Sequence, residues 1–540
     1  MSFPFDWTTG YPSQRSPVFA RNVVSTSHPL AAQAGLRVIQ DGGNAVDAAI
    51  AAAAMMTIVE PCSNGLGSDM FCIVWDGATL HGLNASGPAP QAWTPEYFSQ
   101  RHGSGASAPP KRGWDSVTVP GAVAGWAMLH ERYGTRPFED LMAPAADIAR
   151  RGYAVPRVVQ HKWTAAAALR EITEQPGFAQ AFLPHGRAPH VGERFCLPAA
   201  AQALERIGRT RGEDFYHGEI AQAIEAHAQA HGGALRASDL AAYRPQWVQP
   251  LAQDYRGYTL HEIPPNGQGI AAQMALGILA HFPIAQWPVD SAQSQHLQIE
   301  AMKLAFADVY RHVAEPRTMR LSPQQMLDPA YLAQRARMID LQRAQDFGPG
   351  LMPQGGTIYL TAADERGMMV SFIQSNYMGF GSGVVVPQWG ISLQNRGHGF
   401  SLDPQSDNLV GPGKRPFHTI IPAFLTREGQ PVMSFGVMGG DMQPQGHLQT
   451  LVRMLDYRQQ PQAACDAPRW RFNAGVVNAE VGMPQATVAG LRERGHVVEP
   501  FADSYQDYGA GQFIWRLGDP AVEGYAAASD PRRDGQAAGC

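Results

Sequence analysis

The sequence predicts an α/β protein. Helical periodicity is concentrated in residues 17–60 and 120–350, whereas the chain becomes rich in strands after residue 357. Neither part supplies a plausible closed sheet alone, so we expect residues 1–356 and 357–540 to form one α/β body together. A length of 540 residues fits this prediction, because large α/β enzymes often run longer than an average domain.

Two helices are predicted near the N-terminus. Pro29 begins the first, in "PLAAQAGLRVIQDGG", which ends at the glycine pair Gly42–Gly43. Asn44 can cap the second, in "NAVDAAIAAAAMMTIVEP", which stops before Pro61. The many alanines of the second helix indicate that it packs closely against a flat surface.

Strand signals flank the helical middle of the chain. "MFCIVWDGATLHGL" predicts a hairpin that turns at Asp76–Gly77. "FGPGLMPQGG", residues 347–356, has no periodicity and predicts an exposed linker. "GGTIYLTAADERGMMVSFIQS", residues 355–375, then predicts a strand, a tight turn and a second strand, and helices are expected near 443–458 and 484–494.

Composition excludes several classes of protein. The formal net charge of −5 gives no electrostatic support for nucleic-acid binding. The longest apolar stretch contains an aspartate and is too short to span a bilayer, and the first residues do not resemble a signal peptide, so we expect a cytoplasmic protein without a membrane partner. Five scattered cysteines without a CxxC spacing, and no HExxH motif, predict neither a disulfide scaffold nor a metal site, and no cofactor is implied.

Thr357 opens a predicted strand directly after two glycines. A threonine hydroxyl is a weak nucleophile unless a base takes its proton. If Thr357 becomes the first residue of a chain, its own α-amino group, with a pKa of about 8, is a base within reach. Gly356 would let the preceding peptide adopt the strained conformation that attack on its carbonyl requires. Threonine also suits strands, so this stretch by itself favours an ordinary strand residue.

Further stretches change that interpretation because they occur in a characteristic order. They are "GGNAVDAAIAA", "EPCSNGLGSDMF", "VPGAVAGW", "GFGSG", "LQNRGHGFS", "PGKRPFHTIIP", "GVMGGDMQPQ", "DAPRW" and "ASDPR". With Thr357 they resemble the gamma-glutamyltransferase family, self-cleaving enzymes of the N-terminal-nucleophile hydrolase superfamily. The resemblance covers about residues 20–533.

The resemblance implies a four-layer αββα sandwich and a set of roles. Cleavage between Gly356 and Thr357 would produce a large subunit, 1–356, and a small subunit, 357–540. Thr357 would be the nucleophile of both processing and catalysis. Ser375 occupies the place of a family threonine that hydrogen-bonds the nucleophile. Gly439 and Gly440 match the pair whose backbone N–H groups form the oxyanion hole.

The expected substrate pocket departs from the family pattern at several positions. By an ungapped comparison, Asn84 stands where the family has an arginine that binds the substrate carboxylate. Tyr377 replaces an asparagine, and His418–Thr419 replace a serine pair. We expect these four residues to contact the substrate.

The segment "LQNRGHGFS" departs from the pattern in its charge. Asn395 and Arg396 are expected at the substrate, and Arg396 replaces a glutamine or glutamate, while Gly399 replaces an aspartate that binds the substrate amino group. Arginine binds carboxylates bidentately and repels ammonium groups. The sequence therefore favours an anionic or acyl substrate over a γ-glutamyl one, although Arg396 could instead pair with a structural carboxylate.

These observations predict a self-processing, gamma-glutamyltransferase-like amidohydrolase whose acyl-enzyme is hydrolysed by water. The segment 402–411 is shorter than in lid-bearing members, and an open site favours hydrolysis over transfer. Three alternatives stay open: a true gamma-glutamyltransferase or glutathione hydrolase, an oxamate amidohydrolase or cephalosporin-type acylase, and an uncleaved, non-enzymatic binding protein. The predicted partners are a small-molecule amide and the two subunits of one precursor, an arrangement that also allows a homodimer of the processed heterodimer.

Overall fold

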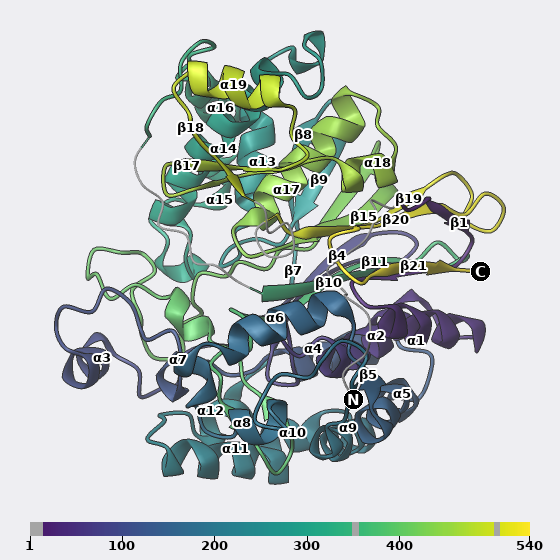
Figure 1. The fold of residues 1–540 in the computed structure, drawn as a ribbon, viewed down its shortest axis with the longest axis vertical. Coiled ribbons are helices and arrows are strands. Elements are labelled where there is room, and N and C mark those ends of the chain that lie inside the picture. Colours follow the sequence, from purple (N-terminus) through teal and green to yellow (C-terminus); the bar gives the residue numbers. More distant parts are fainter. Residues whose placement is uncertain (1–13, 348–355, 502–507) are drawn as a thin grey trace.

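Two seven-stranded sheets lie face to face in the computed structural model, with helices covering the outer face of each (Figure 1). The structure describes residues 14–347, 356–501 and 508–540. Three apolar cores separate the four layers: one between each sheet and its helices and one between the sheets. The predicted four-layer αββα sandwich is confirmed.

The first sheet contains the strand that Thr357 opens. All of its neighbouring strands run antiparallel. Its order is β21 (Gln536–Gly539), β2 (Val23–Thr26), β10 (Gly356–Ala363), β11 (Met369–Tyr377), β3 (Asp69–Trp75), β4 (Leu80–Ala85) and β7 (Gln246–Val248). The predicted hairpins are β3–β4 and β10–β11, and β10 lies near the middle of the sheet.

The second sheet faces the first across the central core. Its order is β1 (Val18–Ala20), β20 (Tyr525–Ser529), β19 (Ala510–Arg516), β15 (Gln430–Met438), β14 (Ala423–Arg427), β9 (Tyr258–Glu262) and β8 (Leu251–Tyr255). Strands β8 and β9 lie within the stretch whose pattern is mostly helical, and the sequence analysis did not identify them. Each sheet takes strands from both sides of residue 356, so the two segments of the chain share both sheets.

The predicted N-terminal helices are α1 (Pro29–Gln40) and α2 (Ala45–Val59). Asn44 caps α2 through a reciprocal pair of bonds with Asp47. Every residue of α2 is buried, because it packs between the first sheet and the outer helices α5 (Phe138–Arg151) and α4 (Ala122–Tyr133). Small alanine side chains permit this close approach on all sides.

The second sheet is covered by α13 (Ile270–Leu279), α14 (Ala292–His312) and α17 (Met442–Leu451). Helix α17, which continues as a π-helical turn at Val452–Asp456, and α19 (Gln485–Glu493) are the helices expected near 443–458 and 484–494. The predicted linker at 347–356 falls mainly on residues 348–355, which lie outside the described residues. Among the described helices, none combines the length and the apolar character needed to cross a bilayer.

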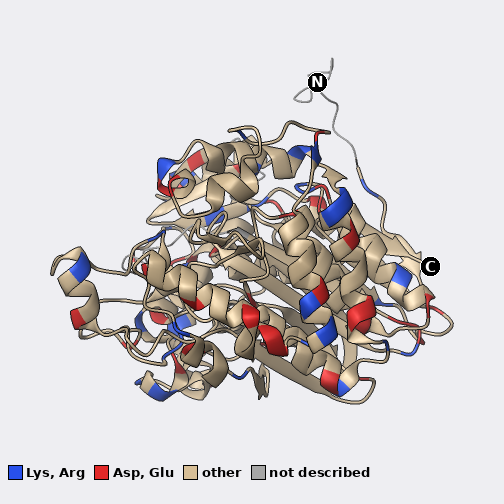
Figure 2. Cartoon of the chain, turned by 90° about the horizontal axis from the view of Figure 1, so that it is seen from below, with Lys and Arg blue, Asp and Glu red and all other residues tan. Residues whose placement is uncertain are grey.

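Smaller elements complete the fold. The helices are α3 (Pro95–His102), α6 (Arg157–Ala167), α7 (Arg170–Thr173), α8 (Phe178–Phe182), α9 (Pro198–Thr210), α10 (Glu213–His217), α11 (Glu219–Ala230), α12 (Ala237–Ala242), α15 (Pro323–Met326), α16 (Pro329–Ala336) and α18 (Pro461–Asp466). The strands are β5 (Tyr153–Ala154), β6 (Arg194–Phe195), β12 (Val385–Val386), β13 (Ile391–Ser392), β16 (Trp470–Asn473), β17 (Val476–Glu480) and β18 (Val497–Phe501). Acidic and basic residues are interspersed along the ribbon (Figure 2).

Candidate active site

Thr357 is buried at the beginning of β10, with 2% of its surface exposed. The pairing of β10 with β11 is irregular between Gly356 and Ile358, directly beside Thr357. The Thr357 Oγ1 hydroxyl donates a hydrogen bond to Ser375 Oγ at 3.2 Å. Ser375 Oγ also accepts from the Tyr377 N–H at 2.7 Å. Ser375 is therefore the hydrogen-bond partner of the Thr357 hydroxyl, and the role of Thr357 as a nucleophile stays a prediction.

Alternation along β10 turns Thr357 toward the second sheet. Thr361 Oγ1 lies 2.6 Å from Ser434 Oγ of β15, and the ring of Tyr359 lies against Gly436. Odd-numbered residues of β10 therefore face β15. Two residues toward the N-terminus on β10 correspond to two residues toward the C-terminus on β15. If this pattern continues by one step, we expect Thr357 to face Met438, the residue before the glycine pair that is predicted to form the oxyanion hole.

Gly439 and Gly440 connect β15 to α17 in conformations that suit glycine. Their φ angles are +121° and +64°. Outside the sheet ladders, neither amide donates a hydrogen bond to a described residue. The Gly440 carbonyl accepts from Gln268 Nε2 at 2.9 Å, which fixes the orientation of this turn. Backbone N–H groups without a partner among the described residues are of the kind that stabilises a developing oxyanion, so the oxyanion hole at Gly439 and Gly440 stays a prediction.

Arg396 is buried with two donors unused. Nη1 donates to Thr419 Oγ1 at 2.8 Å, whereas Nε and Nη2 have no partner among the described residues. The guanidinium carbon lies 4.6 Å from the centroid of the Tyr377 ring, a cation–π contact, and the Tyr377 hydroxyl is also unpaired among those residues. Burial lowers the pKa of Arg396 to about 10, opposed by the charge of Asp69. A guanidinium remains protonated at that value, so the site holds a buried cation with free donors.

Tyr377 owes its position to an unusual backbone conformation. Its φ is +77°, in the left-handed region that side chains other than glycine rarely adopt. The bond from its N–H to Ser375 Oγ helps to hold this conformation. The same strand end therefore positions both Ser375, the hydrogen-bond partner of Thr357, and the Tyr377 ring that contacts Arg396.

His418 is fully buried and bonds to Asp69, at 3.1 Å between Nε2 and Oδ2. Because the Ile420 N–H donates to Nδ1 at 3.4 Å, we assign the proton to Nε2, which donates to Asp69. Burial holds the pKa of His418 well below its ordinary value, reinforced by Arg396 and Arg415. Burial also raises the pKa of Asp69 to about 7, opposed by Arg396 and by backbone amides.

The two predicted asparagines are engaged within the protein. Asn84 Nδ2 donates to Asn266 Oδ1 at 3.0 Å, and its Oδ1 accepts from Ser86. Asn395 accepts from the Met378 N–H at 3.1 Å and donates to a backbone carbonyl. These bonds fix both side chains, and their contact with a substrate stays a prediction.

Three residues near this site were not predicted from the sequence. Asp69 lies in the quoted "GSDMF" stretch but is recognisable only when the sheet places it opposite Ser375. Gln268 comes from a distant loop and links Gly440 to the Thr419 carbonyl. Gln443, in the first turn of α17, has an Nε2 group without a partner among the described residues. Asp69 and Gln443 lie within quoted motif stretches that did not single out these two positions, whereas Gln268 lies outside all of them.

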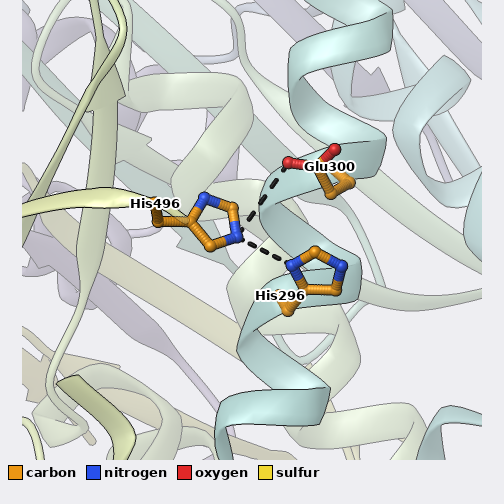
Figure 3. Close-up of side chains that lie close together, drawn as sticks. All are labelled: His296, Glu300 and His496. Atoms are coloured by element: carbon orange, nitrogen blue, oxygen red, sulfur yellow. Dashed lines mark hydrogen bonds and ion pairs between the residues drawn. The ribbon is translucent and has the colours of Figure 1, made fainter. Parts of the chain in front are cut away.

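A separate polar cluster could hold a metal by distance alone. His296, Glu300 and His496 are buried, with ligand atoms within 4.8 Å of one another (Figure 3). Hydrogen bonds already use these atoms, since His496 Nε2 lies 2.7 Å from His296 Nδ1, and Lys303 Nζ donates to Glu300 Oε1 at 2.7 Å. The Lys303 ammonium also lies 3.5 Å from His496 Nδ1, so a cation would meet a positive charge here.

Comparison with known proteins places this site in a family. The gamma-glutamyltranspeptidase family profile matches residues 31–540. A glutathione hydrolase-like proenzyme of Bacillus subtilis is 35% identical over 97% of this chain and 99% of its own length. An oxamate amidohydrolase proenzyme of Klebsiella pneumoniae is 36% identical over 97% of this chain and 99% of its own length.

A solved structure supports the same assignment. The crystal structure of a cephalosporin acylase from Bacillus halodurans superimposes with a TM-score of 0.93 and 46% identity, covering 100% of this chain and 99% of that one. The fold is therefore shared with a protein of known structure.

Proposed function

The chain belongs to the gamma-glutamyltranspeptidase family, and we propose that it is a self-processing amidohydrolase in which Thr357 is the nucleophile. The observation that carries this proposal is the Thr357 hydroxyl, which is buried at the start of β10 and donates a hydrogen bond to Ser375. Two relatives support it, because both are named as proenzymes and both align with this chain over 99% of their own length.

Processing and catalysis would use the same attack. In processing, Thr357 Oγ attacks the Gly356 carbonyl, the peptide C–N bond breaks, and the nitrogen takes the proton to become a free α-amino group. Water then hydrolyses the ester. In catalysis, that amine takes the hydroxyl proton as Oγ attacks a substrate amide, and Gly439 and Gly440 bind the oxyanion. The departing amine receives the proton, and water releases the acid.

Intact mass tests this proposal directly. The wild-type protein should yield two chains that meet at Gly356–Thr357, whereas Thr357→Ala should remain one chain. Thr357→Ser is the matched control, because it keeps a hydroxyl and should still process, though more slowly. A wild type that remains whole after long incubation would leave Thr357 without a free amine and favour the binding-protein alternative.

The substrate proposed for this site carries a carboxylate. Arg396 supplies two free donors in a buried position where an unpaired cation is costly, and a substrate anion would satisfy them. Among the described residues no ion pair within 4.0 Å includes Arg396, and Asp69, whose charge raises the pKa of this guanidinium, contacts His418 at 3.1 Å instead, which supports a role for Arg396 toward a substrate anion. Oxamate amidohydrolase activity or acylase activity toward an acidic acyl group is the specific form we favour.

A panel of amides separates the enzymatic alternatives. Oxamate and glutaryl-p-nitroanilide present a carboxylate without an ammonium group, whereas γ-glutamyl-p-nitroanilide presents both. We expect a higher kcat/KM for one of the first two. Preference for the γ-glutamyl substrate, with transfer to an added amine, would support a true gamma-glutamyltransferase. A homodimer of the processed heterodimer is also proposed, and light scattering of the purified enzyme tests it.

A further inference from the structure

The charge of Arg396 needs compensation that its contacts do not provide. Its side chain is buried, and its one hydrogen bond to a described residue through the guanidinium goes to the neutral Thr419 hydroxyl. A buried cation without a counter-charge is strongly destabilising. Asp69 is the acid whose charge raises the pKa of Arg396. The two side chains form no ion pair within the 4.0 Å limit.

The Asp69 carboxylate is held by hydrogen bonds to other groups, so it influences Arg396 through its charge and not through a direct contact. It is fully buried, and its Oδ1 accepts from Gly121 N–H at 3.0 Å and Gly87 N–H at 3.3 Å, while Oδ2 bonds to His418. Both oxygens therefore face donors other than the guanidinium. In the sheet register Asp69 lies opposite Ser375, so its charge stands one strand away from the partner of Thr357.

His418 links this carboxylate to the arginine through the backbone. Its imidazole bonds to Asp69, and the next residue, Thr419, accepts the bond from Arg396 Nη1. The charge of Arg415 favours the ionised form of Asp69 and so lowers its pKa. The charge of Asp69 in turn contributes to the raised pKa values of Tyr216 and Tyr243. These groups define the electrostatic surroundings of the site.

We infer that Asp69 is a specificity-determining residue that limits the affinity of the site for anions. It balances Arg396 when the site is empty and repels the carboxylate that Arg396 attracts, so the occupied site tolerates one negative charge and disfavours a second. This inference rests on the proposed binding of a carboxylate at Arg396. His418 acts as a positioning residue between the two charges.

The test is the affinity of the processed enzyme for 4-oxopentanoate, which has one carboxylate and a ketone that cannot be hydrolysed. Asp69→Asn keeps the size of the side chain and an acceptor for the glycine amides. It should lower the Kd for 4-oxopentanoate about tenfold and leave the Kd for neutral 2-pentanone unchanged, because only the anion feels the lost charge. Asp76→Asn, in the turn that follows β3, is the matched control and should change neither value.

Each outcome separates this inference from the proposed function. If Arg396→Ala leaves 4-oxopentanoate binding unchanged, the carboxylate site fails. If Arg396→Ala weakens it but Asp69→Asn leaves it unchanged or weakens both ligands, the carboxylate site stands and the inference is overturned. Should Asp69→Asn not fold, Asp69→Ser supplies the second measurement: it also removes the charge, so the Kd for 4-oxopentanoate should again fall about tenfold, and an unchanged Kd would contradict the inference.

Discussion

The Arg396 guanidinium lies over the Tyr377 ring, 4.6 Å from its centroid, and both side chains retain polar atoms without a partner among the described residues. The two positions are 19 residues apart in the sequence, at the end of β11 and in the loop after β13. A buried aromatic face and a planar cation form a rigid platform, which suits recognition of a planar carboxylate.

Replacement of Arg396 tests that platform. Arg396→Ala should raise KM for an acidic amide substrate about tenfold to a hundredfold, since it removes a charge-assisted bidentate contact, with a smaller change in kcat. Arg396→Lys is the matched control and should recover part of the loss, because it keeps the charge but not the fork. Steady-state kinetics with glutaryl-p-nitroanilide measure this, and an unchanged KM in both variants would contradict it.

Tyr377→Phe isolates the hydroxyl from the ring. The stacking on Arg396 should survive, whereas any contact of the hydroxyl with substrate is lost, so we expect KM to rise severalfold. The free energy of unfolding should stay equal or increase slightly, because a buried hydroxyl without a partner is removed. Kinetics and chemical denaturation of the same preparation measure both; a lower stability with unchanged KM would assign Tyr377 a structural role.

Gly439→Ala should damage processing and turnover together. A methyl group at this position would lie 3.0 Å from Gly509 Cα, at a φ of +121° that disfavours side chains. Displacement of an oxyanion donor is expected to lower kcat about a hundredfold. The rate of chain cleavage, followed by mass, should fall as well. Gly411→Ala, in open space, is the control and should process normally.

The stability of the protein should depend on pH through Asp69. Its pKa is raised from 3.8 to about 7, so the folded state binds the proton more tightly than the unfolded state. This contribution to stability is fully present below about pH 4 and is lost as the pH rises through 7. The difference in Tm between Asp69→Asn and wild type should therefore shift in favour of the variant between pH 4 and pH 7. A constant difference across this range would show that Asp69 does not titrate there.

The His296–Glu300–His496 cluster should be structural. His296→Ala removes bonds to His496 and to the Asp340 carbonyl, so it should lower the free energy of unfolding by about 1–3 kcal/mol and leave KM unchanged. Thermal denaturation and kinetics measure the two effects. A Tm that rises with added Zn²⁺ in the wild type but not in His296→Ala would instead identify a metal site.

The prediction of local structure from the sequence succeeded where the signal is local. The cap at Asn44, the glycine turn at Asp76–Gly77 and the strand that Thr357 opens all depend on residues close together in the chain. Strands β8 and β9 were not predicted, because they pair with each other within a mostly helical stretch. The pairing of β9 with β14, which joins this hairpin to the second sheet, involves residues far away in the sequence.

By itself, the sequence determined the fold class, the identity of the nucleophile as a prediction, and the loss of the acidic group expected near a substrate ammonium. Only the tertiary structure decided that Arg396 has two nitrogen donors without a partner among the described residues, and that Asp69 lies opposite Ser375 in the sheet. The reason is physical: a hydrogen bond requires two polar atoms within about 3 Å of each other, and residues such as Asp69 and His418 reach that distance only when separate strands and loops converge.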